Sequence, residues 1–581
     1  MIGRFPILDV SPVVEFGGER VGVKAIPNES ITVSATIIRE GHDGFVASVN
    51  LLDAKSKVVS KTPMQEVWPG SSRFSGEIRP TSVGDWTFQI EVRGTNQGEF
   101  AKELISQSAN YPISVERERA LVGSWYEFFP RSEGAVRNPD GSITGGTFKT
   151  AAKRIAEIAE MGFDVLYIPP IHPIGVTHRK GKNNSLTATA SDPGVPWGVG
   201  NSAGGHDAVN PELGTIEDFK DFLKVAKKNG VEVALDLALQ CSPDHPWVTT
   251  HPEWFTKRKD GSIAYAENPP KKYEDIYPIN FDNDYPGLFR EVLRIVKFWI
   301  NQGVSIFRVD NPHTKPVNFW QELIREVSKD HPETIFLSEA FTNPPMMHAL
   351  GKAGFQQSYT YFTWRVTKQE LMEYGREVAD GTSAFFRPNF WVNTPDILPF
   401  HLQSGNPAVF ALRAVLAATL SPSWGMYAGY ELYEHLPIAE GKEEYRDSEK
   451  YEIRIRDWGG AIKKGISLAP FITELNSIRK KNIALQRLRN LKFHETNSDQ
   501  IIAYSKREGY NLILVVVNLD GFYSREATIN WNLNELGLNQ DNFEVQDLLD
   551  GKKYQWNSST YVKLDPARPN GKVAHICRVK I

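Results

Sequence analysis

Three acidic residues each come at the end of a short apolar run in the sequence. Asp310 ends the run 306–309, Glu339 ends the run 335–338, and Asp396 closely follows the run 390–393. Carboxylates gathered in one place can act as nucleophile and as general acid or base. One such acid alone is more often a helix cap or a salt-bridge partner. Three of them, with Arg308 on the same strand face as Asp310, favour a catalytic site.

The elements that would position these acids alternate between apolar strands and amphipathic helices from about residue 120 onward. Eight strands are predicted, at 121–129, 165–168, 231–235, 304–309, 334–337, 359–363, 390–393 and 425–429. Helices are predicted between several of them, including 216–229, 286–301 and 316–329. Eight β/α units favour a closed parallel (β/α)8 TIM barrel, in which residues at the carboxyl ends of the strands converge.

Both ends of the chain have strand patterns instead. Ile31, Val33, Ala35 and Ile37 alternate with polar residues, and the run 512–517 near the other end is strongly apolar. We predict a catalytic barrel at 118–488, flanked by an N-terminal β-sandwich at 1–117 and a C-terminal β-sandwich at 489–581. The barrel segments 171–206 and 239–282 are too long for simple connections, and such loops usually carry function.

Composition excludes several functional classes. Lys and Arg total 66 against 70 Asp and Glu, which gives a net charge of −4, so neither nucleic acid nor an anionic membrane is an expected partner. Only two cysteines occur, Cys241 and Cys577, which excludes a disulfide scaffold and favours a reducing compartment. With neither a signal-peptide pattern nor an apolar run of membrane-spanning length, we expect a cytoplasmic protein.

Longer motifs around the acids resemble a known enzyme family. FRVDNPH at 307–313, FLSEA at 336–340, and GHD at 205–207 with NPELGT at 210–215 resemble the α-amylase superfamily, glycoside hydrolase family 13. RVDNPHTKP, SEAFT, QSYTYFTWR, RPNFWVNTPDILP and DSEKYEIR are similar to strings of the maltosyltransferases that use α-maltose 1-phosphate to extend α-1,4-glucans. The resemblance covers nearly the whole chain. It implies transfer of a maltosyl unit to the non-reducing end of an α-1,4-glucan or maltooligosaccharide, with release of inorganic phosphate.

The same resemblance implies a role for each site residue. Asp310 would be the nucleophile, Glu339 the general acid/base and Asp396 the transition-state stabiliser of a retaining double displacement. Arg308 would keep Asp310 ionised. The resemblance implies phosphate binding by Asn268, Lys271, Tyr273 and Asn311, and maltosyl binding by Lys180, Gln240, Asp275, Lys450 and Tyr451. Trp364 is expected either to stack on a sugar or to pack in the core, with equal weight.

Departures from the amylase pattern argue against a simple hydrolase. Amylases typically have a histidine at the end of the third strand, where this chain reads LDLALQ at 235–240, ending in Gln240. They have Asn-His-Asp where it reads Asn393-Thr394-Pro395-Asp396, and the maltosyltransferases show the same two replacements. The calcium-site asparagine has no match beside Asp236, so we expect no metal and no cofactor. His206 and His313 are expected to form hydrogen bonds rather than bind metal, and Cys241 to be a buried apolar residue.

One departure from the maltosyltransferases concerns the N-terminal domain. Fewer than forty residues separate the motif 86–89 from 123–127, so the family's helical insertion in this domain is reduced or absent. The family is typically homodimeric through this region. We therefore expect a homodimer, with the shortening placing its geometry in question.

Two other functions compete with the maltosyltransferase. An α-glucoside hydrolase or a trehalose-forming isomerase of the same superfamily would not need the phosphate residues Asn268, Lys271 and Tyr273. A non-catalytic glycan-binding protein would not need the three acids. Residues 269–272, read without the family, are typical of a solvated turn.

Overall fold

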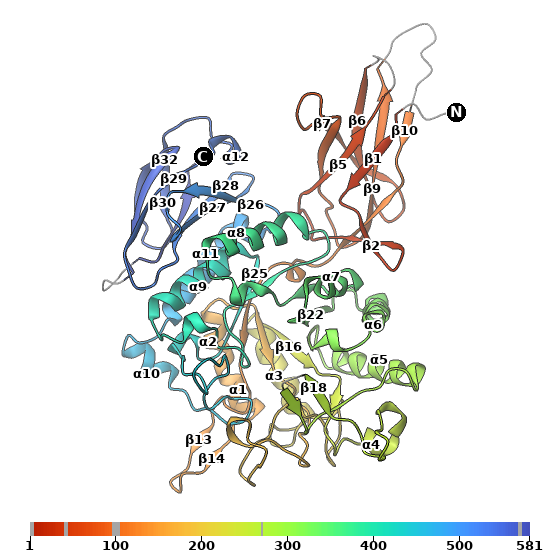
Figure 1. Cartoon of the computed structure of the whole chain (residues 1–581), viewed down its shortest axis with the longest axis vertical. Helices are drawn as coiled ribbons and strands as arrows, with labels where there is room; N and C mark the ends of the chain where they lie inside the picture. The colour runs from red at the N-terminus through yellow and green to blue at the C-terminus, as the bar shows by residue number, and fades with distance from the viewer. Residues whose placement is uncertain (1–4, 40–43, 96–104, 269–270, 567–571, 581) are drawn as a thin grey trace.

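The computed structural model describes residues 5–39, 44–95, 105–268, 271–566 and 572–580, with the side chains of Asn268 and Lys271 outside the description. Figure 1 shows a central barrel, drawn from orange to cyan, with two β-rich regions side by side at one end of it. Within the described residues, no helix combines the length and apolar character needed to cross a membrane.

The barrel is one eight-stranded parallel sheet, which confirms the predicted fold. Its strands in chain order are β12 (Gly123–Glu127), β15 (Val165–Ile168), β16 (Glu232–Leu237), β21 (Ile306–Asp310), β22 (Ile335–Glu339), β23 (Gln357–Ser358), β24 (Asn389–Trp391) and β25 (Ser423–Tyr427). Buried rings fill its interior, including Trp125, Tyr167, Tyr359 and Trp391. Such a packed interior leaves the carboxyl ends of the strands as the place for a site.

The barrel closes between β23 and β24 by an unusual joint. Among the described residues, this joint has one isolated backbone bridge, between Ser358 and Pro388. Polar side chains add to it: Asn389 Nδ2 donates to Gln357 Oε1 at 3.0 Å, and Thr363 Oγ1 donates to the Trp391 carbonyl at 3.1 Å. We call this joint the barrel seam.

The predicted sixth strand, 359–363, is wrong. The strand is the shorter β23, and Tyr361–Trp364 form a 3-10 helix, η6. The aromatic residues that suggested a strand pack against the next strand instead, with the Phe362 ring stacked on Phe390 at 4.5 Å. The carbonyls of Phe362 and Arg365 accept hydrogen bonds from the buried Arg413 guanidinium, so they are not available to a β ladder.

Helices surround the barrel, close to the predicted positions. The longer ones are α3 (Ile216–Lys228), α5 (Tyr285–Asn301), α6 (Val317–Asp330), α7 (Pro344–Ala353), α8 (Lys368–Arg376), α9 (Pro407–Leu420) and α11 (Ala469–Lys481). Most have one buried face, as expected for a barrel's outer layer. Helix α9 differs because it is buried on nearly all sides, and it contacts both β25 and β28 of the C-terminal sheet.

The flanking regions are β-rich, as predicted. The N-terminal sheet contains β1 (Ile7–Ser11), β4 (Val23–Ala25), β5 (Ile31–Ile37), β6 (Phe45–Leu52), β7 (Val58–Glu66), β8 (Arg73–Ile78), β9 (Gly84–Gly94), β10 (Ile105–Gln107) and β11 (Tyr111–Val115). Its apolar residues enclose one core. Within the described residues up to 117, every element is a strand.

The C-terminal sheet has eight strands around a second core. They are β26 (Leu491–Thr496), β27 (Ile501–Glu508), β28 (Asn511–Asn518), β29 (Arg525–Asn530), β30 (Phe543–Asp547), β31 (Lys553–Trp556), β32 (Ser559–Leu564) and β33 (Ala574–Val579). The domain boundaries at 117/118 and 488/489 stay predictions.

Candidate active site

Two of the predicted catalytic acids lie side by side on neighbouring barrel strands. Asp310 ends β21, Glu339 ends β22, and the two residues are directly paired in the register of the parallel ladder. Arg308 connects them, since its Nη1 donates to Asp310 Oδ1 at 2.8 Å and its Nη2 lies 3.2 Å from Glu339 Oε1. All three side chains are at least nine-tenths buried, so their charges interact with little solvent screening.

A third carboxylate shares the same guanidinium. Asp236 of β16 accepts hydrogen bonds from Arg308 Nη1 at 2.8 Å, from the Tyr167 hydroxyl at 2.5 Å and from Trp197 Nε1 at 3.2 Å. From the sequence, Asp236 is notable only as the neighbour of a missing calcium-site asparagine. Its position near the carboxyl end of a barrel strand, as for Asp310, was the signal that could have revealed it.

The surroundings of Glu339 favour its protonated form. Burial raises the pKa of Glu339 well above that of a free glutamic acid; Arg308 opposes this shift, while Asp310 and Asp396 add to it. The backbone N–H of Asn311 donates to Glu339 Oε2 at 3.1 Å. Asn311 adopts the left-handed conformation, with φ of 43°, which asparagine tolerates better than most residues. A carboxyl group that stays protonated near neutral pH can serve as a general acid.

Asp396 lies beside a cavity and is paired with a lysine. Lys450 Nζ donates to Asp396 Oδ1, which joins the loop after β24 to the loop after β25. Burial disfavours the charge of Lys450, but the adjacent Asp396 carboxylate raises the pKa of the amine overall. Both residues line a cavity of about 270 Å³, together with Tyr273 and Tyr451. The structure thus brings four predicted site residues together; we call this space the Asp396 cavity.

The other predicted sugar-binding residues lie close by. Lys180 is buried, and its Nζ is 2.5 Å from Glu274 Oε2. Asp275 is also buried, which raises the pKa of its carboxyl group, and its Oδ1 has no hydrogen-bond partner among the described residues. Gln240 Nε2 donates to the Trp197 carbonyl at 3.3 Å.

Trp197 is a central residue that sequence reasoning missed. Its indole contacts Asp236, its carbonyl accepts from Gln240, and Lys450 Nζ lies 5.5 Å from its ring centre. It comes from the long loop 171–206, where no periodic pattern indicates which side chains turn inward. An indole placed between carboxylates and an ammonium group can pack against a sugar ring.

Three predicted binding residues are not brought to the site by any described contact. Trp364 Nε1 donates to both Glu443 carboxylate oxygens at 3.1 Å, and its ring packs edge-on against Phe341 at 5.2 Å. Neither partner is a predicted site residue, so the packing alternative accounts for its contacts. Asn268 and Lys271 pair in the short hairpin β18 (Ala266–Asn268) and β19 (Lys271–Tyr273), but their side chains lie outside the described part of the chain.

Glu127 is a further buried acid that the sequence analysis missed. It ends β12 on the same rim, is 1% exposed, and its Oε2 has no hydrogen-bond partner among the described residues. Burial raises the pKa of Glu127 well above its usual value, although the Arg308 charge opposes this. Because the predicted strand extended to residue 129, Glu127 was placed inside a strand rather than at its end.

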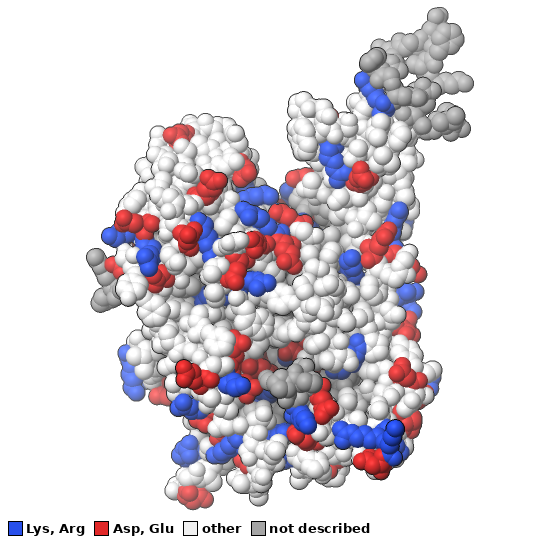
Figure 2. Space-filling view, in the orientation of Figure 1, with Lys and Arg blue, Asp and Glu red and all other residues white. Residues whose placement is uncertain are grey.

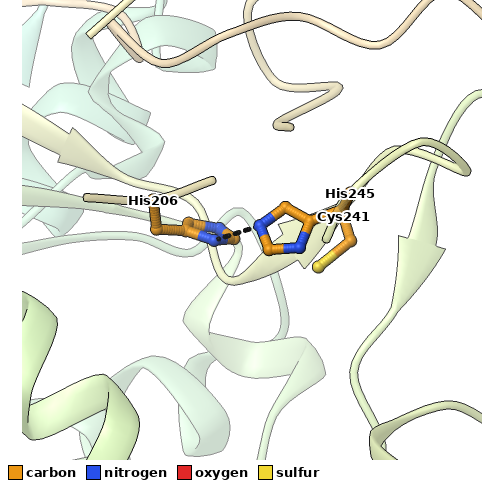
Figure 3. A group of neighbouring side chains, drawn as sticks. All are labelled: His206, Cys241 and His245. Carbon is orange, nitrogen blue, oxygen red and sulfur yellow. Dashed lines mark hydrogen bonds between the residues drawn. The ribbon is translucent and has the colours of Figure 1, made fainter. Parts of the chain in front are cut away.

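Next to Gln240 lies a group of three residues whose types can bind a metal ion. His206, Cys241 and His245 are all buried, with their ligand atoms within 4.8 Å of one another (Figure 3). His245 Nδ1 accepts from the Trp247 N–H at 3.0 Å, so its Nε2 carries the proton toward His206 Nδ1, 3.1 Å away. His206 Nε2 then donates to the Ala238 carbonyl at 2.8 Å.

This chain of hydrogen bonds uses all four ring nitrogens, so a metal could bind only by breaking it. Burial raises the pKa of the Cys241 thiol, which keeps it protonated. The three residues therefore do not fit a metal site, and His206 forms the hydrogen bonds expected of it. His313 differs, because its Nδ1 is buried without a hydrogen-bond partner among the described residues.

Two family descriptions match the chain. Residues 3–104 match domain N/S of the α-1,4-glucan:maltose-1-phosphate maltosyltransferases, and residues 493–579 match the C-terminal GLGE family. Structures with similar folds include a maltogenic α-amylase from Thermotoga neapolitana and an α-amylase from Geobacillus thermoleovorans. Both have a TM-score of 0.60, at 20% and 16% identity, over 80% and 79% of this chain and 99% and 98% of theirs, which supports the fold alone.

Curated relatives match over the full length. An α-1,4-glucan:maltose-1-phosphate maltosyltransferase of Streptomyces coelicolor is 48% identical over 653 residues, covering 99% of this chain and 97% of the relative. That of Mycolicibacterium smegmatis is 44% identical over 684 residues, covering 100% and 97%. Since this chain has 581 residues, these relatives contain segments without a counterpart here. With identity of this level over both chains, the protein belongs to the α-1,4-glucan:maltose-1-phosphate maltosyltransferase family, built on the barrel fold of the α-amylases.

Proposed function

We propose that this chain transfers a maltosyl unit from α-maltose 1-phosphate to the non-reducing end of an α-1,4-glucan and releases inorganic phosphate. The observation that best supports this reaction is the pairing of Asp310 and Glu339, which lie side by side and both contact the Arg308 guanidinium. Retaining glycosyl transfer needs two carboxyl groups at such close quarters, one ionised and one protonated. The family supplies the donor and the acceptor, because its members are named for them.

In the first step, Asp310 attacks the anomeric carbon of the donor while the bond to the phosphate oxygen breaks. Glu339 donates its proton to the departing phosphate, leaving a maltosyl–Asp310 ester. The Lys450–Asp396 pair and Tyr451 border the cavity that would receive the sugars, with Lys180, Gln240 and Asp275 nearby. Asn268, Lys271, Tyr273 and Asn311 would bind the phosphate.

In the second step, the glucan hydroxyl replaces the phosphate. Ionised Glu339 accepts the proton of the acceptor's 4-hydroxyl as its oxygen attacks the anomeric carbon and releases Asp310. Two inversions give net retention, so the new linkage is α. Transfer prevails over hydrolysis when the acceptor is bound in a reactive position, because effective molarities of well-oriented groups reach about 10⁵–10⁸ M.

Products distinguish this function from its rivals. The protein is mixed with α-maltose 1-phosphate and a maltooligosaccharide acceptor, phosphate is assayed, and anomeric protons are followed by NMR. We expect phosphate release, a lengthened α-linked glucan and, with added phosphate, the reverse reaction. Free maltose as the main product would indicate a hydrolase, and binding of glucan without turnover would indicate a glycan-binding protein. Asp310→Asn is the inactive control.

Cytoplasmic location, α-glucan biosynthesis and a homodimer belong to the same proposal. Both cysteines are free and buried, which suits a reducing compartment. Lys, Arg, Asp and Glu are interspersed on the face shown in Figure 2, without a stripe of one sign that would attract a polyanion. Trp68 and Val67 are exposed on the N-terminal sheet region and could lie in a dimer interface, which light scattering of variants at these positions would test.

A further inference from the structure

Arg131 lies behind the Asp396 cavity and connects two loops of the barrel rim. It follows β12, is 8% exposed, and its Nη1 donates to the Gly194 carbonyl at 2.8 Å. Its Nη2 donates to the carbonyls of Glu449 and Lys450 at 2.8 and 3.0 Å. One guanidinium therefore ties the loop 171–206 to the segment 448–451.

That segment forms one wall of the Asp396 cavity. Ser448, Lys450 and Tyr451 line the Asp396 cavity on one side. Arg131 and Ile453 line a separate cavity of about 400 Å³. The backbone carbonyl of Lys450 thus faces Arg131, while its side chain faces Asp396. Arg131 itself does not line the Asp396 cavity.

The wall is also held through the Glu449 side chain. Its carboxylate accepts from the Tyr427 hydroxyl and from Arg456 Nη1, the latter at 3.0 Å, and the residue is 1% exposed. With Glu449 anchored on its side chain and both carbonyls anchored by Arg131, the peptide at 449–450 has little freedom to rotate. A lysine on such a fixed peptide loses less conformational entropy when it binds a ligand.

We propose that Arg131 is a positioning residue of the donor site, which holds the Glu449–Lys450 peptide so that the Lys450 ammonium group meets Asp396 and the donor sugars. This inference rests on the proposed function for the identity of the donor. Arg131 acts on the wall from behind, so its removal weakens donor binding without removing a group that touches the sugar.

A second buried arginine provides a matched control. Arg479 is 3% exposed and also donates to three backbone carbonyls, those of Ala418, Ser421 and Pro422. Burial lowers the pKa of each guanidinium to about 10. The carbonyls at Arg479 precede β25 and so lie at the opposite end of the barrel from the site. Arg131→Met and Arg479→Met remove the same kind of interaction, one near the donor and one far from it.

The kinetic test compares both variants in the full chain, with α-maltose 1-phosphate varied at saturating acceptor. We expect both to lower the melting temperature, and only Arg131→Met to raise KM for the donor, by about 10-fold, with a smaller change in kcat. Arg131→Lys, which keeps the charge but reaches fewer carbonyls, should fall between. In a Lys450→Met background, Arg131→Met should no longer change KM, because both substitutions remove the same contact.

A chemical test does not depend on turnover. Acetylation of Lys450 by a small amine-specific reagent, mapped by peptide mass spectrometry, should be slow in the wild type and several-fold faster in Arg131→Met, but not in Arg479→Met. Unchanged labelling, an equal KM rise in Arg479→Met, or additive effects with Lys450→Met would each overturn the proposal. A wild type that releases no phosphate from maltose 1-phosphate would refute the proposed function, while the labelling result would still decide the role of Arg131.

Discussion

The two ends of the barrel each contain a deeply buried arginine, but the groups around the two guanidiniums differ. At the carboxyl end, Arg308 contacts the carboxylates of Asp236, Asp310 and Glu339. At the amino end, Arg479 contacts three backbone carbonyls. The first arrangement places three acids around one cation, so at least one acid is poorly compensated and takes up a proton. In the second, the hydrogen-bond partners of the guanidinium are uncharged carbonyls, which hold the chain in place.

This difference shows how one fold separates chemistry from stability. At one end, burial raises the pKa values of Asp236 and Glu339, which suits acid–base work, and crowding of this kind costs folding free energy. Carbonyls gathered around an arginine satisfy buried acceptors and contribute to stability without any reactive group. Substitutions at the two ends should therefore have opposite signatures in activity and stability.

The largest effect is expected for Asp310→Ala. Loss of the nucleophile should lower kcat by at least about 10⁴-fold, whereas the melting temperature should change little, because the carboxylate belongs to the crowded end. Donor binding should persist, since other residues are proposed to hold the sugars and the phosphate. Steady-state kinetics and calorimetry would check this beside Arg479→Met, which should lose stability and keep kcat. Wild-type turnover in Asp310→Ala would refute the nucleophile assignment.

Glu339 should give the next largest effect, with a distinct pH signature. Since burial raises the pKa of Glu339, its protonated form persists at neutral pH, and kcat/KM for the donor should fall as pH rises through that raised pKa. Glu339→Ala should slow turnover about 10²–10⁴-fold.

With a glycosyl fluoride, which leaves without protonation, Glu339→Ala should form an adduct on Asp310 that mass spectrometry detects. The rate at which this adduct forms should not decrease as pH rises, because the variant has no Glu339 carboxyl group to lose its proton. A wild-type profile that is flat on the alkaline side would contradict the general-acid role.

Lys271→Ala and Asn268→Ala should affect the donor more than the acceptor. Loss of one hydrogen bond to a charged phosphate costs about 1.5–3 kcal/mol, so KM for maltose 1-phosphate should rise roughly 10- to 100-fold. KM for the glucan should stay near the wild-type value. Lys224→Ala, on an exposed position of α3, is a control for the general loss of a positive charge. If only the acceptor KM rose, the hairpin would belong to the glucan subsites.

The smallest effect concerns residues of the carboxyl end that do no chemistry. Burial lowers the pKa values of His172, His206 and His245 to about 3, 4 and 2, against about 6.5 when unfolded. Below about pH 6.5 the unfolded state therefore binds more protons, and stability falls as pH decreases, by about 1.4 kcal/mol per pH unit for each imidazole.

Urea unfolding at several pH values between neutral and mildly acidic measures how the free energy of unfolding depends on pH. This dependence should be shallower in His206→Asn than in the wild type. If the pH dependence were unchanged, the conclusion that His206 is neutral in the folded protein would be wrong.

The sequence predicted the barrel and its three acids because both depend on local patterns. Apolar strands recur between amphipathic helices, and the acids follow strand ends, where the barrel geometry brings distant residues together. Asp236, Trp197 and Arg131 were missed as site residues because their roles depend on which side chains face each other across loops. The prediction of the sixth strand was wrong because aromatic residues suit a strand and a buried turn equally well. The Arg413 hydrogen bonds that favour the turn come from a helix distant in sequence.

The barrel seam has a consequence for how this enzyme can be tuned. At the other joints, backbone hydrogen bonds form ladders, whereas at the seam the replaceable side chains of Gln357, Asn389 and Thr363 supplement one backbone bridge. The seam joins β24, which precedes Asp396, to β23, which pairs with the Glu339-bearing strand β22. We expect substitutions there to loosen or tighten the barrel, and so to change the spacing of the predicted catalytic acids without replacing any of them. Selection for turnover or for heat tolerance has a place to act outside the active site.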